Sequence, residues 1–190
     1  MKILMHICCA NCAIYPLKSL SEIQEDGWTI TGLWFNPNIH PYIEYKHRLD
    51  AVKRLEALWN SEEKATLIPL GKVGLKIEYI DHYGLKEYLR NVVGNEAKRC
   101  EYCYRVRLEE TARRAKDINA DAFTTTLLGS PYQKFDMLVE IGRALQDKYL
   151  VEFYVDDLRK GFYEGKKIAK RLGLYQQQYC GCVYSEMERK

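Results

Sequence analysis

Short apolar runs alternate along the chain with longer segments in which apolar residues recur every three or four positions. The short runs are typical of buried strands, because a strand covered on both faces shows no polar alternation. The longer segments are typical of amphipathic helices, whose apolar stripe follows the helical repeat. We therefore expect strands at Lys2–Cys8, Trp28–Phe35, Ala65–Leu70, Ala122–Leu128 and Tyr149–Val155, and helices at Tyr15–Asp26, Ile43–Trp59, Leu85–Val92, Arg99–Asp117, Ser130–Asp147 and Tyr163–Leu172.

This alternation predicts the fold class. Strands separated by helices form right-handed βαβ units and one parallel sheet. A chain of 190 residues, 47% of them hydrophobic, is long enough for one sizeable core. We predict a single α/β domain over residues 1–190, with a Rossmann-like parallel sheet of the HUP or PP-loop-like type flanked by helices. We also predict a small helical insertion at residues 71–98. Residues 159–190 are expected to form a C-terminal extension for substrate and redox chemistry.

Polar and thiol side chains follow three of the expected strands. Cys8–Cys9 ends the first strand, Ser130 and Gln133 follow the fourth, and Asp156–Asp157 ends the fifth. Ligands of parallel sheets bind beyond the carboxyl ends of the strands. We therefore expect these side chains to meet at one rim of the sheet and to form a site there.

The chain contains no apolar run of 18 residues, and its start turns polar too soon for a secretory signal. We expect a cytoplasmic protein with no membrane partner. Cysteines stay reduced in the cytoplasm, where clustered thiols more often bind metal than form structural disulfides.

A net charge of +3 does not by itself demand a nucleic-acid partner. The basic residues are nevertheless uneven, because Arg159–Lys160, Lys166–Lys167 and Lys170–Arg171 crowd one stretch. Tyr163, Tyr175 and Tyr179 lie close to them in the sequence. Such a stretch suits phosphates, with rings that stack on bases, although a solvated helix face has the same composition.

The seven cysteines fall into three groups: Cys8, Cys9 and Cys12; Cys100 and Cys103; and Cys180 and Cys182. The adjacent pair together with the C-x-x-C pair supplies four thiolates, enough for a tetrahedral zinc or a 4Fe–4S cluster. Two adjacent cysteines such as Cys8 and Cys9 can bind a 4Fe–4S cluster with less strain than they can bind a single zinc ion. Thiol redox chemistry and plain buried cysteines remain alternatives. Cys12 is able to replace either member of the pair or to bind a second metal.

Cys180 and Cys182 are separated by a single residue. A disulfide between them would close a small ring with unrelaxed geometry and would be easily reduced. We interpret the pair as a redox-active dithiol, the alternative being two more metal ligands or idle thiols. His6, on the first strand, is expected to be a hydrogen-bonded core histidine.

Several of these segments together resemble the QueH family, the cobalamin-independent epoxyqueuosine reductases. The resemblance rests on His6–Cys12, Asn36–Pro41 with Glu44–Tyr45, Arg99–Tyr104 with Arg107–Leu108, Thr124–Lys134, Asp157–Gly161 and Tyr179–Cys182. It implies reduction of epoxyqueuosine to queuosine at the wobble position of tRNA. The implied partners are the anticodon stem-loop and an external electron donor.

The resemblance also implies the roles of the cysteines. A 4Fe–4S cluster would be held by Cys8, Cys9, Cys100 and Cys103, and Cys180–Cys182 would be a redox-active disulfide. An additional iron beside the cluster is implied, with Cys12 as our choice for one of its ligands.

Two other functions compete with this one. The first is an iron–sulfur tRNA sulfur transferase, which needs a glycine-rich phosphate loop after the first strand, where Cys8–Cys12 stands instead. The second is a zinc-stabilised RNA-binding module. Iron and sulfide content would separate the two iron–sulfur enzymes from the zinc module, and the missing glycine-rich phosphate loop argues against the sulfur transferase.

Overall fold

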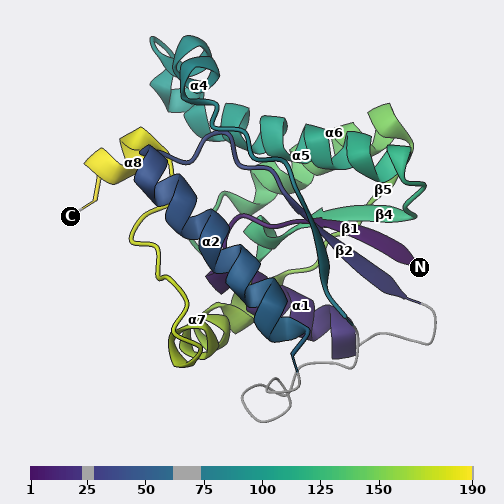
Figure 1. Cartoon of the computed structure of the whole chain (residues 1–190). Helices are drawn as coiled ribbons and strands as arrows, with labels where there is room; N and C mark the ends of the chain where they lie inside the picture. Colours follow the sequence, from purple (N-terminus) through teal and green to yellow (C-terminus); the bar gives the residue numbers. More distant parts are fainter. Residues whose placement is uncertain (23–27, 62–73, 190) are drawn as a thin grey trace.

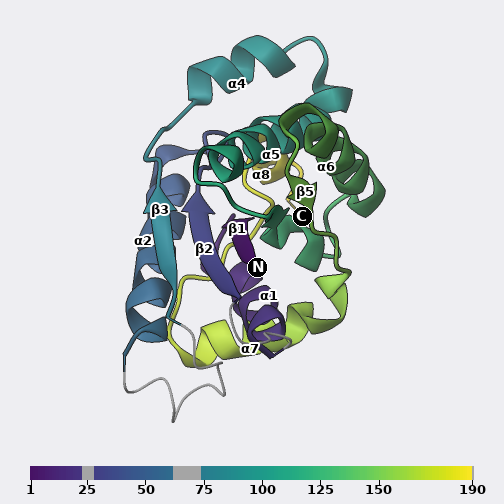
Figure 2. The same cartoon turned by 90° about the vertical axis from the view of Figure 1, so that its right-hand side faces the viewer.

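A parallel sheet forms the centre of the protein in a computed structural model that describes residues 1–22, 28–61 and 74–189. Within these residues the sheet has five strands in the order β3-β2-β1-β4-β5 (Figures 1 and 2), and all neighbouring strands pair in parallel. The strands are β1 (Lys2–His6), β2 (Thr29–Trp34), β3 (Lys76–Tyr79), β4 (Ala122–Thr125) and β5 (Glu152–Phe153). The predicted Rossmann-like α/β fold is confirmed.

Helices cover both faces of the sheet (Figures 1 and 2). One face carries α1 (Ala10–Glu22), α2 (Tyr42–Trp59) and α7 (Phe162–Arg171), and the other carries α5 (Arg99–Asp117) and α6 (Phe135–Tyr149). The short helices α4 (Leu85–Val92) and α8 (Val183–Met187) lie outside these layers. Single 3₁₀ turns occur at η1 (Glu96–Lys98), η2 (Thr126–Gly129) and η3 (Leu158–Gly161).

The alternation of side chains along β1 divides the core in two. Met5 packs with α1, α2 and α7, whereas Leu4 packs with α5 and α6. Both side chains are fully buried, because a central strand of a parallel sheet is covered on both faces. The two apolar layers hold the loops at the carboxyl ends of β1 and β4 in place.

Helix bounds follow the sequence pattern unevenly, and α1, which was expected to begin at Tyr15, begins at Ala10. The structure confirms Leu85–Val92 and Arg99–Asp117 at the predicted ends. The expected strand Ala65–Leu70 lies outside the described residues. Residues 71–98, predicted as a helical insertion, contribute the strand β3, which pairs with β2.

The segment after β4 differs from the prediction. The strand was expected to reach Leu128, yet β4 ends at Thr125, whose Oγ1 accepts a hydrogen bond from the Leu127 N–H and turns the chain into η2. The next helix was expected to begin at Ser130, and it begins at Phe135. Ser130 and Gln133 lie in the intervening segment and line the same cavity as Cys8. None of the described helices has the length and apolar character needed to cross a bilayer.

Candidate metal and redox centre

The turn between β1 and α1 gathers three buried thiols. The Sγ atoms of Cys8, Cys9 and Cys12 lie within 4.8 Å of one another, and those of Cys8 and Cys9 are 3.6 Å apart. The Cys8 N–H donates to Oγ1 of Thr126 (3.1 Å), and that hydroxyl donates to the Cys8 Sγ (3.4 Å). Because the strand order reverses between β1 and β4, this turn occupies the switch point where such sheets bind ligands.

The three thiols hold their protons unequally. Hydrogen bonds from Cys12 and then from Cys9 place the pKa of Cys8 well below its usual range. Burial raises the pKa of Cys9, and hydrogen bonding with Cys8 raises the pKa of Cys12. Cys8 is therefore the most readily ionised of the three thiols. A metal requires deprotonated thiols, so metal binding would release the remaining protons.

Cys100 and Cys103 stand one turn apart at the start of α5. Cys103 is buried in the apolar cluster that also contains Cys8, Cys9 and Cys12, and the half-buried Cys100 packs against this cluster. Burial raises the pKa of the Cys103 thiol to about 12. Among the described residues, neither α5 sulfur joins the set that lies within 4.8 Å. The α5 thiols thus reach the same core as the first group without closing into one compact four-sulfur shell.

Cys180 and Cys182 lie in the C-terminal segment before α8. Cys180 is exposed, and Nε2 of Gln133 is 3.4 Å from its Sγ. Burial opposes ionisation of Cys182, but the nearby polar groups of Tyr88 and Ser185 outweigh it and lower the pKa of this thiol. Negative charge on either the Cys180 or the Cys182 sulfur would raise the pKa of Cys103 further. All seven cysteines are free thiols.

A cavity of about 510 Å³ joins these groups. Cys8 and Cys12 line it from the β1 turn, Ser130 and Gln133 from the loop after β4, and Cys180 from the C-terminal segment. Pockets of roughly 300–1,000 Å³ hold ligands of the size of a nucleoside. The cavity therefore has thiols on two walls and room for a substrate between them.

The C-terminal segment touches the first thiol group directly. Nε2 of Gln177 lies 2.9 Å from the Cys9 Sγ and 3.6 Å from the Cys12 Sγ. The other end of this amide is fixed, because its Oε1 accepts from Nδ2 of Asn11 (2.9 Å). Gln177 thus donates to two of the three sulfurs.

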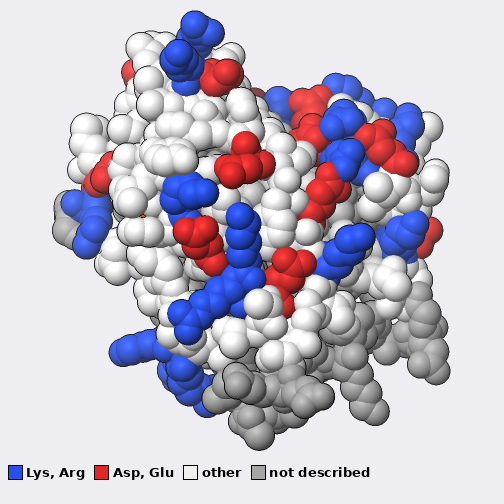
Figure 3. Space-filling view, in the orientation of Figure 1, with Lys and Arg blue, Asp and Glu red and all other residues white. Residues whose placement is uncertain are grey.

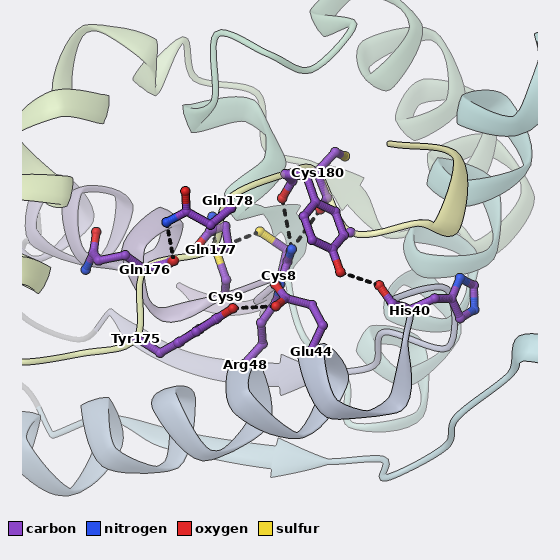
Figure 4. A network of polar contacts seen from close by, with 12 residues as sticks. Cys8, Cys9, His40, Glu44, Arg48, Tyr175, Gln176, Gln177, Gln178 and Cys180 are labelled. Atoms are coloured by element: carbon purple, nitrogen blue, oxygen red, sulfur yellow. Dashed lines mark hydrogen bonds and ion pairs between the residues drawn. The ribbon is translucent and has the colours of Figure 1, made fainter. Parts of the chain in front are cut away.

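A buried ion pair on α2 holds the same segment (Figure 4). Nε of Arg48 donates to Oε1 of Glu44 at 2.7 Å, and its two terminal nitrogens donate to the carbonyls of Cys180 (2.8 Å) and Tyr179 (2.9 Å). The Tyr175 hydroxyl donates to the second Glu44 oxygen. We call Arg48, Glu44, Tyr175 and Tyr179 the α2 clamp.

The predicted rim is confirmed for the loops after β1 and β4 and is wrong for the fifth strand. Asp156–Asp157 does not line the cavity. Oδ1 of Asp157 instead accepts from the Arg159 N–H (3.2 Å) and Nε (2.7 Å), so it caps η3. His6 is the expected core histidine, with Nδ1 2.9 Å from Oγ1 of Thr125.

The basic C-terminal stretch separates into two kinds of residue. Arg159 is paired with Asp157, whereas Lys166, Lys167, Lys170 and Arg171 are exposed on α7 and form no ion pair with any described residue. In Figure 3, Lys and Arg side chains project from the lower left, where Figure 1 places α7.

The tyrosines near this stretch have different environments. Tyr163 is 62% exposed beside the basic residues of α7. Tyr175 and Tyr179 are committed to the α2 clamp, and the Tyr179 hydroxyl also donates to the His40 carbonyl at 2.6 Å. Only Tyr163 of the three therefore offers an open ring.

Sequence reasoning missed the residues that organise the thiols. Glu44 and Arg48 are polar, yet they sit four apart on the side of α2 that faces the core, next to Tyr45 and Leu49. Ionisable residues on an apolar face mark buried pairs, and this pattern was visible in the sequence. A weaker indication was present in the sequence for Gln177, which is the middle of three consecutive glutamines shortly before Cys180.

Comparison with known proteins gives one consistent match. The family model described as "Epoxyqueuosine reductase QueH" matches residues 3–188. A QueH from Dehalococcoides mccartyi, named epoxyqueuosine reductase, is 38% identical over 188 residues, which cover 99% of this chain and 94% of that protein. The enzyme of the same name from Thermotoga maritima is 32% identical over 190 residues, covering 99% and 92%. The one from Haemophilus influenzae is 32% identical over 193 residues, covering 97% and 71%.

Proposed function

Since this chain belongs to the QueH family of epoxyqueuosine reductases and is an oxidoreductase, we propose that it reduces epoxyqueuosine to queuosine at the wobble position of tRNA. One observation carries the proposal. Thiols from the β1 turn and from the C-terminal segment face a single cavity of about 510 Å³ at the switch point of the sheet, and the α5 thiols pack in the same apolar cluster as Cys8.

The donor atoms suit the cofactor that we propose. We assign Cys8, Cys9, Cys100 and Cys103 as ligands of a 4Fe–4S cluster, and Cys12 as a ligand of one additional iron. An all-thiolate set in an apolar wall favours iron–sulfur binding, and its spread between the β1 turn and α5 suits a cluster better than one zinc. When bound, these groups would supply single electrons and a Lewis acid for the epoxide oxygen.

The C-terminal dithiol supplies the right number of electrons. Conversion of an epoxide to an alkene consumes two electrons and two protons and releases water. Oxidation of Cys180 and Cys182 to a disulfide yields two electrons and two protons, and an external donor then restores the thiols. Gln133 supports this role, because the Tyr104 hydroxyl fixes its Oε1 at 2.9 Å while its Nε2 faces the Cys180 sulfur.

The surface beside the cavity suits a single-stranded RNA loop. Lys166 lines the cavity and begins the exposed basic face of α7. At the rim, the exposed rings of Tyr132 and Tyr163 flank Phe162, with centroid distances of 5.6 and 5.3 Å. Bases of RNA loops stack on such rings while lysines meet the phosphates. We propose that the anticodon loop binds here.

The two competing functions have less support. A sulfur transferase that activates its substrate with a nucleotide needs backbone amides after β1 to cradle phosphate, and this turn is filled by three buried thiols. A zinc-stabilised RNA-binding module has no use for an exposed thiol at the mouth of a cavity. Membership of a reductase family also favours the first proposal.

The test is conversion of the substrate. Protein purified without oxygen would be incubated with tRNA that carries epoxyqueuosine and with a chemical reductant, and the nucleosides would be analysed by mass spectrometry. We expect a product that lacks one oxygen atom, and no product from Cys100→Ala under the same reductant. Failure of the fully loaded wild type to convert the nucleoside would refute the proposal.

A further inference from the structure

The backbone on both sides of Cys180 is fixed by Arg48 of α2 and by His40, which precedes this helix. Three successive carbonyls of the C-terminal segment accept hydrogen bonds from these two residues. The carbonyls of Tyr179 and Cys180 accept from Arg48 at 2.9 and 2.8 Å, and that of Gly181 accepts from the His40 N–H at 2.7 Å. The position of the Cys180 sulfur is therefore set mainly by its backbone.

The ion pair of the α2 clamp is buried at a cost. Arg48 is 2% exposed and Glu44 is 5% exposed. A buried ion pair is a weak source of stability, because apolar residues of similar volume often serve as well or better. Fold stability alone thus does not explain why a buried ion pair stands here. The hydrogen bonds that Arg48 donates from its terminal nitrogens to the C-terminal segment do explain it.

The turn between Cys180 and Cys182 packs closely against the Arg48 guanidinium. Gly181 has a φ of +142°, which side chains of L-residues rarely allow. A Cβ at this position would come within 3.2 Å of Nη1 of Arg48 and 3.3 Å of Cγ1 of Ile39. The dithiol turn and Arg48 therefore fit each other closely, so a change on either side should disturb the same contact.

We infer that Arg48 is a positioning residue for the redox step, which holds the Cys180/Cys182 turn against the cavity. This inference rests on the proposed function for its catalytic meaning. Arg48 takes no part in bond making or electron transfer. By fixing the carbonyls of Tyr179 and Cys180, it keeps the exposed sulfur beside Gln133 and keeps Cys182 half-buried.

The experiment compares variants of two arginines on α2. Arg48→Met keeps the length of the side chain and removes its donors, and Arg48→Lys keeps the charge but cannot reach two carbonyls. Arg54→Met is the matched control, because Arg54 is exposed on the same helix. In anaerobic, metal-loaded protein, the rate at which N-ethylmaleimide alkylates Cys182 would be followed by peptide mass spectrometry, together with kcat and KM for tRNA.

We expect Arg48→Met to raise the alkylation rate of Cys182 about tenfold, because the segment opens locally. Its kcat should fall about tenfold with KM for tRNA nearly unchanged, since misplaced reacting groups cost rate and not binding. Arg48→Lys should restore the melting temperature but not the slow alkylation of Cys182. Arg54→Met should match the wild type throughout.

The inference would be overturned if Arg48→Met kept the wild-type alkylation rate of Cys182 and the wild-type kcat. It would also be overturned if Arg48→Met lost the visible absorbance of the cofactor. If Arg48→Met does not fold, Gly181→Ala disturbs the contact from the segment side and should give the same faster alkylation of Cys182. Normal alkylation in a folded Gly181→Ala would also overturn it. A wild type without reductase activity would instead refute the proposed function, and alkylation would still decide the role of Arg48.

Discussion

The cysteines differ in what surrounds each sulfur, and these surroundings separate the roles that we propose for them. Cys8 lies beside the thiols of Cys9 and Cys12 and accepts from the Thr126 hydroxyl, and Cys103 is enclosed by apolar side chains. Cys180 is exposed to the cavity. Buried sulfurs beside other thiols suit permanent ligands, whereas an exposed thiol suits exchange with an external reductant.

This contrast predicts different losses for single substitutions. Cys8→Ala and Cys103→Ala should each abolish turnover and the visible absorbance, because each removes a proposed cluster ligand. Cys180→Ala should slow turnover and leave the absorbance intact. Absorbance spectra and nucleoside mass spectrometry on the same samples provide the check. Full activity in both Cys180→Ala and Cys182→Ala would show that the dithiol has no role.

Among the elements, α7 joins the site to its proposed partner. Ile168 and Ala169 are buried on the side of α7 that packs on α1, so the lysines of the helix face solvent. A helix anchored on one face and basic on the other is suited to a phosphate backbone. Gly165 allows the close approach, because a Cβ there would lie 3.1 Å from the Asn11 carbonyl.

Neutralising this face should weaken tRNA binding and flatten its dependence on salt. We expect Lys166→Gln, Lys167→Gln and Lys170→Gln in combination to reduce the slope of log affinity against log salt by about 2, at roughly 0.7 per lost phosphate contact. Binding of an anticodon stem-loop RNA at several salt concentrations gives this slope.

The control carries the same change in charge elsewhere. Lys86, Lys98 and Lys116 are exposed on α4, η1 and α5, so replacing all three with Gln should leave the slope close to the wild-type value. Equal slopes for the two triple variants would move the RNA surface away from α7.

The elements also differ in how far the sequence predicts them. The ends of α5 were predicted because its buried positions, among them Tyr104, Leu108 and Ala112, repeat without interruption. The strand β3 was not predicted, since it is a four-residue edge strand with only Ile77 buried. The cysteine groups were found from their spacing. The α2 clamp was not, because it joins Arg48 to residues more than 130 positions away.

At the scale of the whole molecule, a second buried histidine makes the fold sensitive to acid. His40 is packed between the rings of Tyr83 and Tyr88, with centroid distances of 5.6 and 4.9 Å. Burial, and then the charge of Arg107, lowers the pKa of His40 to about 4. The folded protein therefore keeps this ring neutral over a range in which the unfolded chain binds a proton.

The free energy of unfolding should accordingly decrease as the pH is lowered. Above the unfolded pKa of about 6.5, His40 is neutral in both states and adds no pH dependence. Between about pH 6.5 and 4 the unfolded state takes up the proton first, so the free energy of unfolding drops by roughly 3 kcal/mol. Urea unfolding between pH 7.5 and 4.5 should show a smaller drop for His40→Gln than for the wild type. The exposed control His47→Gln should retain the full drop, and an unchanged drop in His40→Gln would contradict this account.

The account depends most on the β1 turn and α5 sharing one inorganic centre, and the iron and acid-labile sulfide content of Cys103→Ala tests this most directly. Wild-type protein purified without oxygen should contain about four irons and about four sulfides per chain. Cys103→Ala should lose most of both while it remains folded. One zinc without sulfide in the wild type, or full iron and sulfide in Cys103→Ala, would contradict the account.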